Sequence, residues 1–91
     1  MANHASTKVV IRNKLGLHAR PAMCFVDAAT AFRSSVSVKR ADQSVDGKSI
    51  MQMMMLAATA GTPLKIVAEG EDSPKALDAL EKLVNDRFGE E

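Results

Sequence analysis

Residues 16–22, GLHARPA, decide where the first helix of this chain begins. Pro21 suits the first turn of a helix, because the backbone N–H that proline lacks would have no partner there. Apolar residues then recur at helical spacing on one face: Ala22, Phe25, Val26, Ala29 and Phe32. We therefore predict a helix that begins just after His18, with the imidazole at the positive end of the helix dipole.

A strand is predicted upstream of this stretch. The run KVVIR is β-branched and apolar, which favours a strand that starts at Lys8 and ends near Asn13. A loop containing Gly16 then leads to the helix. Residues 1–7, MANHAST, are polar, and we expect them to be loose, with His4 in a frayed end.

A hairpin is predicted downstream of the helix. Residues 34–40 alternate polar side chains with Val36 and Val38, as a half-buried strand does. The sequence ADQ then predicts a turn, and SVDG predicts a short return strand. These two strands should pair with each other.

A second, short helix follows the hairpin. Ser49 suits its N-cap and Gly61 its C-terminal stop. The run MQMMML contains more Met and Leu than one face of a short helix can bury. We predict that Met53 and Leu56 point inward and that two other methionines, Met51 and Met54, stay at the surface.

The chain ends in a strand and a helix. Residues 62–70, TPLKIVAEG, alternate between a face of Leu64, Ile66 and Ala68 and a face of Lys65, Val67 and Glu69. The last helix is predicted from a cap at Ser73, Pro74 in the first turn, an apolar stripe and a stop at Gly89. The stripe comprises Leu77, Leu80, Val84 and Phe88.

The predicted order is strand, helix, strand, strand, helix, strand, helix, which favours an α+β fold in two layers. An antiparallel sheet would be covered on one side by the helices. The 91 residues form a single domain in this prediction, because a chain of this length has no room for a second core.

Composition restricts the classes of function. The chain has no Trp or Tyr and three Phe, so recognition of nucleic-acid bases by stacking is not expected. Its net charge is +1, but residues 1–48 carry eight Lys and Arg against three Asp and Glu, and residues 49–91 carry four against eight. A single cysteine, Cys24, fits a reducing compartment, and no long apolar run suggests a membrane span, so we expect a cytoplasmic protein.

The sequence allows four roles for His18. A metal site is disfavoured, because His4, His18 and Cys24 show no paired-ligand spacing, and we expect no metal or cofactor. A hydrolase site is disfavoured, because no nucleophile motif is present. A neutral imidazole could instead accept a phosphoryl group, whose oxygens would suit the helix start and the guanidinium of Arg20. A histidine without a role at the helix entry stays open at this point.

Two separated motifs, GLHARPA and GKSIM, together with the later AEGEDSPKALDAL, resemble the histidine-containing phosphocarrier (HPr) family of the bacterial phosphoenolpyruvate-dependent phosphotransferase system. The resemblance runs from about Lys8 to Phe88. It implies an open-faced β-sandwich, with a four-stranded antiparallel sheet and three helices on one face (βαββαβα). Members of the family are carriers rather than enzymes.

The resemblance also implies roles for individual residues. His18 would be phosphorylated on Nδ1 by enzyme I and would pass the group to an enzyme II component, the enzyme IIA, with Arg20 contacting the phosphate. Ser49 would be the regulatory site of an HPr kinase/phosphorylase. The surface that docks partners would comprise Lys48, Ile50, Met51, Met54 and Met55.

The family includes sugar-transport members and a regulatory nitrogen-branch paralogue. The motifs NKLGLHARPA and GKSIMQMMMLAA look closer to the nitrogen-branch paralogue, because Leu15, Asp27 and Thr30 replace residues typical of sugar transport. The alternative function is therefore a regulatory protein, whose phosphorylation at His18 or Ser49 controls binding to a transporter, kinase or transcription factor. We expect a monomer that neither binds nucleic acid nor inserts into a membrane.

Overall fold

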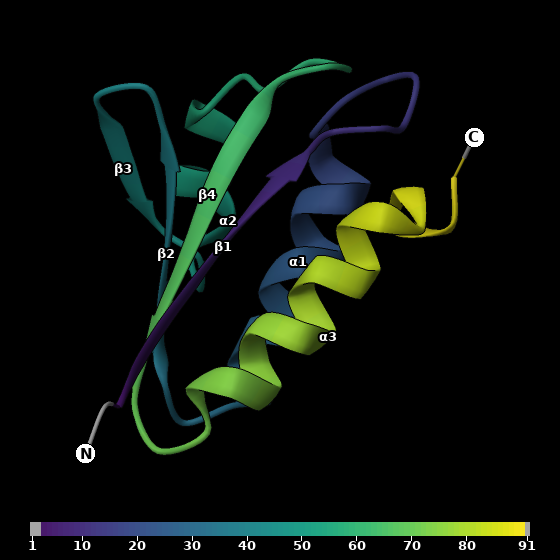
Figure 1. The fold of residues 1–91 in the computed structure, drawn as a ribbon. Helices are drawn as coiled ribbons and strands as arrows, with labels where there is room; N and C mark the ends of the chain where they lie inside the picture. Colours follow the sequence, from purple (N-terminus) through teal and green to yellow (C-terminus); the bar gives the residue numbers. More distant parts are fainter. Residues whose placement is uncertain (1–2, 91) are drawn as a thin grey trace.

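The computed structural model describes residues 3–90 and has four strands and three α-helices. In chain order they are β1 (His4–Val10), α1 (Ala19–Thr30), β2 (Ser35–Arg40), β3 (Gln43–Asp46), α2 (Ile50–Met55), β4 (Pro63–Glu69) and α3 (Ser73–Asn85). A 3₁₀ turn, η1 (Arg87–Gly89), follows α3. The predicted element order and fold class are confirmed (Figure 1).

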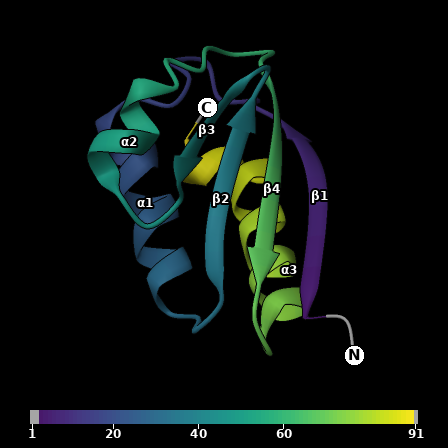
Figure 2. The same cartoon turned by 90° about the vertical axis from the view of Figure 1, so that its left-hand side faces the viewer.

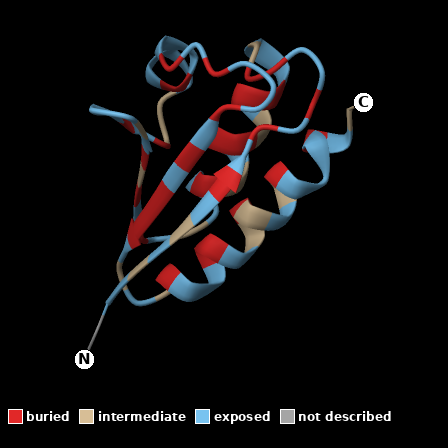
Figure 3. Cartoon of the chain, turned by 45° about the horizontal axis from the view of Figure 1, so that its top comes forward, coloured by how far each residue is buried: buried red, intermediate tan, exposed pale blue. Residues whose placement is uncertain are grey.

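The strands form one antiparallel sheet in the order β1-β4-β2-β3. Helices α1 and α3 lie side by side behind the sheet, and its other face is left open (Figure 2). Along β2 and the first half of β4, buried residues alternate with more exposed ones, because successive side chains point to opposite faces, whereas Ile66, Val67 and Ala68 of β4 are all buried (Figure 3). Only one face of the sheet is therefore covered by helices.

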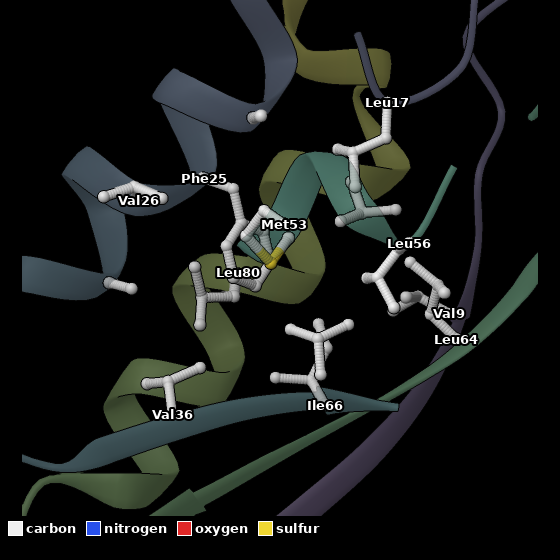
Figure 4. Close-up of a cluster of buried hydrophobic side chains, with 14 of the residues drawn as sticks. Val9, Leu17, Phe25, Val26, Val36, Met53, Leu56, Leu64, Ile66 and Leu80 are labelled. Carbon is white, nitrogen blue, oxygen red and sulfur yellow. The ribbon is translucent and has the colours of Figure 1, made fainter. Parts of the chain in front are cut away.

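The core fills the space between this face and the helices (Figure 4). Phe25 from α1, Leu80 from α3 and Ile66 from β4 meet there, and each is buried. Met53 and Leu56 are completely buried, whereas Met51 and Met54 are exposed, so the predicted division of the second helix is confirmed. The helix α2 is thereby held to the same core as α1 and α3.

The first strand begins earlier than predicted. The expectation that residues 1–7 are loose is wrong for the segment from His4 to Thr7, which pairs with β4, and residues 1 and 2 lie outside the described residues. The backbone of this polar segment bonds to the edge of the sheet, and the Thr7 hydroxyl donates to Glu81 on α3 at 3.0 Å. The strand ends at Val10 rather than near Asn13, because Ile11 bonds through its N–H to the loop carbonyl of Thr62 instead.

Helix α2 ends at Met55 rather than at Gly61, so the predicted C-terminal stop is wrong. Its last carbonyls accept hydrogen bonds from the neighbouring hairpin: Arg40 Nη1 donates to Leu56 O at 2.7 Å, and Gln43 Nε2 donates to Met55 O at 3.2 Å. These bonds satisfy carbonyls that a helix end leaves free. The chain then turns away through Ala57, whose φ is +50°.

The last helix also differs at both ends. Its N-cap residue is Asp72 rather than Ser73, and the Asp72 carboxylate accepts hydrogen bonds from the Ser34 hydroxyl and from the N–H groups of Arg33 and Ser34. The bond from the Ser34 hydroxyl and that from the Arg33 N–H lower the Asp72 pKa to about 2. The helix ends at Asn85, before the predicted stop at Gly89, and η1 then buries Phe88 against the core.

Candidate functional site

The loop that carries His18 is fixed against the segment that follows α2. Ile11 N donates to Thr62 O at 3.0 Å, and Leu17 N donates to Ala58 O at 2.8 Å. Between them, Gly16 has φ +73°, and a Cβ there would lie 2.6 Å from Ala58 O. Only glycine combines this backbone angle with so close an approach, so Gly16 sets the position of the loop.

His18 is the N-cap residue of α1, as predicted, and its backbone is extended. Its carbonyl accepts the first helical hydrogen bond from Ala22 N at 3.0 Å, but its side chain makes no capping bond. Among residues 3–90, the N–H groups of Ala19 and Arg20 donate to no protein acceptor, and Pro21 has no N–H. Two backbone donors are therefore free at the positive end of a twelve-residue helix.

The imidazole of His18 is held from the other end of the chain. Glu90 Oε1 lies 3.1 Å from His18 Nε2 and accepts a hydrogen bond from Asn13 Nδ2, also at 3.1 Å. The His18 side chain is 38% exposed and that of Glu90 is 18% exposed. The hydrogen bond from His18, together with the bond from Asn13 and the charge of Arg20, lowers the Glu90 pKa.

This contact determines which ring nitrogen carries the proton. An ionised carboxylate can only accept hydrogen bonds, so His18 Nε2 must donate to Glu90. In the neutral ring, Nδ1 then bears the lone pair and has no proton. In this tautomer Nδ1 is the ring nitrogen with a lone pair available for chemistry.

Asn13 and Glu90 were not identified from the sequence. Asn13 is buried, and its Nδ2 also donates to Gly16 O at 2.6 Å, which links the loop to Glu90. The only sequence signal for Asn13 was a polar residue at the end of an apolar strand. Glu90 follows η1, and its contact with His18 spans 72 positions, so no local pattern could indicate it.

Arg20 lies in the first turn of α1 and is exposed. Within the described part of the chain, its guanidinium forms no ion pair, although its charge contributes to the lowered pKa of Glu90. Its contact with phosphate stays a prediction.

Ser49 is the N-cap residue of α2, as predicted, and its hydroxyl accepts a hydrogen bond from Gln52 N at 3.2 Å. The ammonium of Lys48 donates to Phe32 O at 2.9 Å, which ties the start of α2 to the end of α1. Lys48 therefore has a structural role whether or not it contacts a partner.

Large apolar side chains are exposed on the loop before α1 and on helices α1 and α2. We define the apolar patch by these side chains: Leu15, Met23, Ile50, Met51, Met54 and Met55. Met51 is 80% exposed. Helices α1 and α2 pack together, so the patch lies on neighbouring elements. Four of its members are residues predicted to dock partners, and Leu15 and Met23 stand before and after His18 in the sequence.

Within residues 3–90, no group of three or more His, Cys, Asp or Glu side chains could hold a metal ion. Over the same residues, no helix is long and apolar enough to cross a membrane.

Comparison with known proteins gives consistent matches. Residues 5–86 match the family model described as "PTS HPr component phosphorylation site". The chain is 52% identical over 84 residues to the phosphocarrier protein HPr of Pseudomonas aeruginosa, covering 91% of this chain and 93% of that protein. It is 48% identical over 82 residues to HPr of a serogroup A strain of Neisseria meningitidis, covering 90% and 92%. The crystal structure of HPr-C-His from Thermoanaerobacter tengcongensis matches with a TM-score of 0.92 and 42% identity, covering 96% of this chain and 98% of that one.

Proposed function

This chain belongs to the HPr family of phosphocarrier proteins of the phosphotransferase system, and on that premise we propose that His18 carries the phosphoryl group. Enzyme I, charged from phosphoenolpyruvate, would donate the group, and an enzyme II component would accept it. The protein is a carrier and not a catalyst, so it would be a substrate of both partners.

The transfer would use the lone pair of His18 Nδ1. A bond forms between Nδ1 and phosphorus while the bond from phosphorus to the donor breaks, and the electron pair of that bond returns to the donor. No proton has to leave Nδ1, because the ring proton is on Nε2 and is held by Glu90. Glu90 would also stabilise the positive charge that the ring gains as it is phosphorylated.

The transferred group would be received by the start of α1. The free N–H groups of Ala19 and Arg20 lie on the same first turn as the histidine, and anions bind favourably at such a helix end. The guanidinium of Arg20 would add charge-assisted hydrogen bonds. The observation that carries the proposal is this combination of a held imidazole and an uncapped helix start.

The apolar patch would dock the partners. A carrier must present its phosphoryl group to one protein and then to another, so its histidine must remain accessible. Methionine side chains can pack against differently shaped surfaces, which suits a patch with more than one partner. We further expect the protein to act in the cytoplasm as a monomer.

Phosphate transfer from labelled phosphoenolpyruvate tests the proposal. With enzyme I present, the wild-type protein should acquire label and His18→Ala should acquire none. His4→Ala is the matched control, because His4 is the other histidine and its side chain is 59% exposed in β1. Label retained in His18→Ala and lost in His4→Ala would reject His18 as the site. Assays with enzymes I of the sugar and nitrogen branches would identify the donor.

A second candidate function is regulation through Ser49, which caps the helix that bears most of the apolar patch. A phosphate on Ser49 would bring about two negative charges next to the docking surface. An HPr kinase/phosphorylase would be the modifying enzyme. This role would make the protein a regulator as well as a carrier.

The variant Ser49→Asp tests the regulatory role, because aspartate keeps the N-cap while adding negative charge. It should lower the rate at which enzyme I phosphorylates His18 by roughly tenfold, the effect of about 1.4 kcal/mol in the transition state. Ser44→Asp, on the exposed edge strand β3, is the charge-matched control. Equal rates for the wild type and Ser49→Asp would contradict this mechanism.

A further inference from the structure

Three lysines stand in one row across the open face of the sheet. In the strand register, Lys65 of β4 lies directly opposite Lys8 of β1 on one side and Lys39 of β2 on the other. All three side chains are exposed. Their neighbours along the strands, such as Val9, Val38 and Leu64, are buried on the helix-covered face, so the lysine side chains project from the opposite face.

This row is unfavourable in the absence of a ligand. Like charges directly opposite each other on neighbouring strands repel, and strands are about 4.8 Å apart. Among residues 3–90, none of the three ammonium groups lies within ion-pair distance of a carboxylate. Within the described part of the chain, no direct ion pair therefore offsets the repulsion.

The row borders a shallow hollow of about 300 Å³. The three lysines line it together with Ala41, Pro63 and Leu64. Its walls thus provide three positive charges around a small apolar base. No residue of the His18 loop or of the apolar patch contributes to it.

We propose that this hollow binds a compact polyanion with two or more linked phosphoryl groups, such as a pyrophosphate, a triphosphate or the phosphate chain of a nucleotide. Lysine ammonium groups bind phosphates as point charges on flexible stems, so three of them can converge on one small ligand. A row that spans roughly 10 Å, two strand spacings, matches a chain of phosphoryl groups better than a single phosphate.

The surrounding charges favour a compact ligand over an extended anionic surface. Asp42 lies in the turn beside Ala41, and Asp46 lies opposite Ser37, one row from Lys39. A bilayer or a nucleic-acid duplex would bring its own negative charge against these carboxylates. A ligand confined to the hollow would avoid them.

Titration of the full chain with pyrophosphate, tripolyphosphate and ATP tests the proposal. Backbone amide signals followed residue by residue should shift in a saturable manner at Lys8, Lys39 and Lys65, at constant ionic strength. Inorganic phosphate should bind at least fivefold more weakly than tripolyphosphate. Equal affinities for tripolyphosphate and ATP would identify the phosphoryl chain as the ligand, and tighter binding of ATP would identify a nucleotide.

Charge removal at the centre of the row provides the matched comparison. Lys65→Gln should weaken tripolyphosphate binding roughly fivefold, the effect of losing one nearby charge. Lys82→Gln, which removes an exposed charge on α3, should leave the affinity unchanged. Shifts that never saturate, shifts confined to His18 and Arg20, or equal losses in the two variants would each overturn the proposal.

Discussion

Helices α1 and α2 begin in opposite ways, although each begins at a residue proposed to carry phosphate. At α1, the side chain of His18 turns toward Glu90 and leaves two N–H groups free. At α2, the hydroxyl of Ser49 accepts a hydrogen bond from the N–H of Gln52 in the first turn. The start of α1 therefore has no side-chain cap, whereas the start of α2 has one, although the N–H groups of Ile50 and Met51 also lack an acceptor within the described residues.

The lengths of the two helices explain how both arrangements are stable. A side-chain N-cap contributes roughly 1 kcal/mol to a helix. Helix α1 has twelve residues and a buried apolar face, so it can be stable without this contribution. Helix α2 has six residues, of which only Met53 is buried, so its cap matters more. The histidine proposed to carry the phosphoryl group therefore lies at the start of the helix that depends less on a cap.

The largest effect is expected from a substitution that displaces the start of α1. Gly16→Ala would force a side chain into the left-handed backbone region and against Ala58 O. We expect the free energy of unfolding to fall by about 2–3 kcal/mol, and phosphorylation of His18 to slow as the loop moves. Chemical denaturation and the labelling assay measure the two effects. Gly89→Ala is the control for left-handed strain alone, because a Cβ there would meet nothing within 4 Å.

A smaller effect is expected from removing the cap of α2. Ser49→Ala should lower the free energy of unfolding by about 1 kcal/mol, because Gln52 N loses its acceptor. Ser44→Ala, at an exposed position in β3, should change it by less than about 0.5 kcal/mol. His18→Ala removes no cap, and we expect it to destabilise the protein less than Ser49→Ala. The reverse order in denaturant titrations would show that the two starts do not differ as described.

The open start of α1 could be predicted from the sequence because its causes are local. Pro21 and the apolar stripe behind it lie within a few turns of His18. The end of α2 could not be predicted in the same way. The helix ends where Arg40, which lies on β2, donates a hydrogen bond to Leu56 O. Likewise, Thr7 became part of a strand only because β4 lies beside it.

The same distinction applies to the candidate site. The sequence predicts His18 as the residue that would react, but it could not predict Glu90. The chain brings Glu90 to His18 only through α3 and η1, which precede it. Its carboxylate depends on Asn13 as well, and that contact spans 77 positions. Residues that only the tertiary structure brings together are far apart in the sequence, so no local spacing of residues identifies them.

The smallest expected effect concerns this positioning residue. Glu90→Gln keeps the shape of the side chain but weakens its hold on the Nε2 proton of His18, because a neutral amide accepts a hydrogen bond less strongly than a carboxylate. We expect the rate of phosphorylation to fall roughly threefold at neutral pH. The KM should be the same for the wild-type protein and the variant. Nitrogen chemical shifts of the ring should show a smaller fraction protonated on Nε2. Glu71→Gln, at an exposed position before α3, is the matched control.

The pH dependence of stability separates positioning by Glu90 from a merely steric role. The Glu90 pKa is lowered in the folded protein, first by the hydrogen bond from His18, so the folded state favours the ionised form. Its stabilising contribution is therefore present above the usual carboxyl pKa of about 4.3 and is lost as the pH falls through the lowered value. The difference in Tm between wild type and Glu90→Gln should hold from pH 7 to about pH 5 and shrink below that. A difference that persists unchanged at pH 2 would mean that the charge of Glu90 has no part in holding the ring, and the assignment of Nδ1 as the free nitrogen would lose its basis.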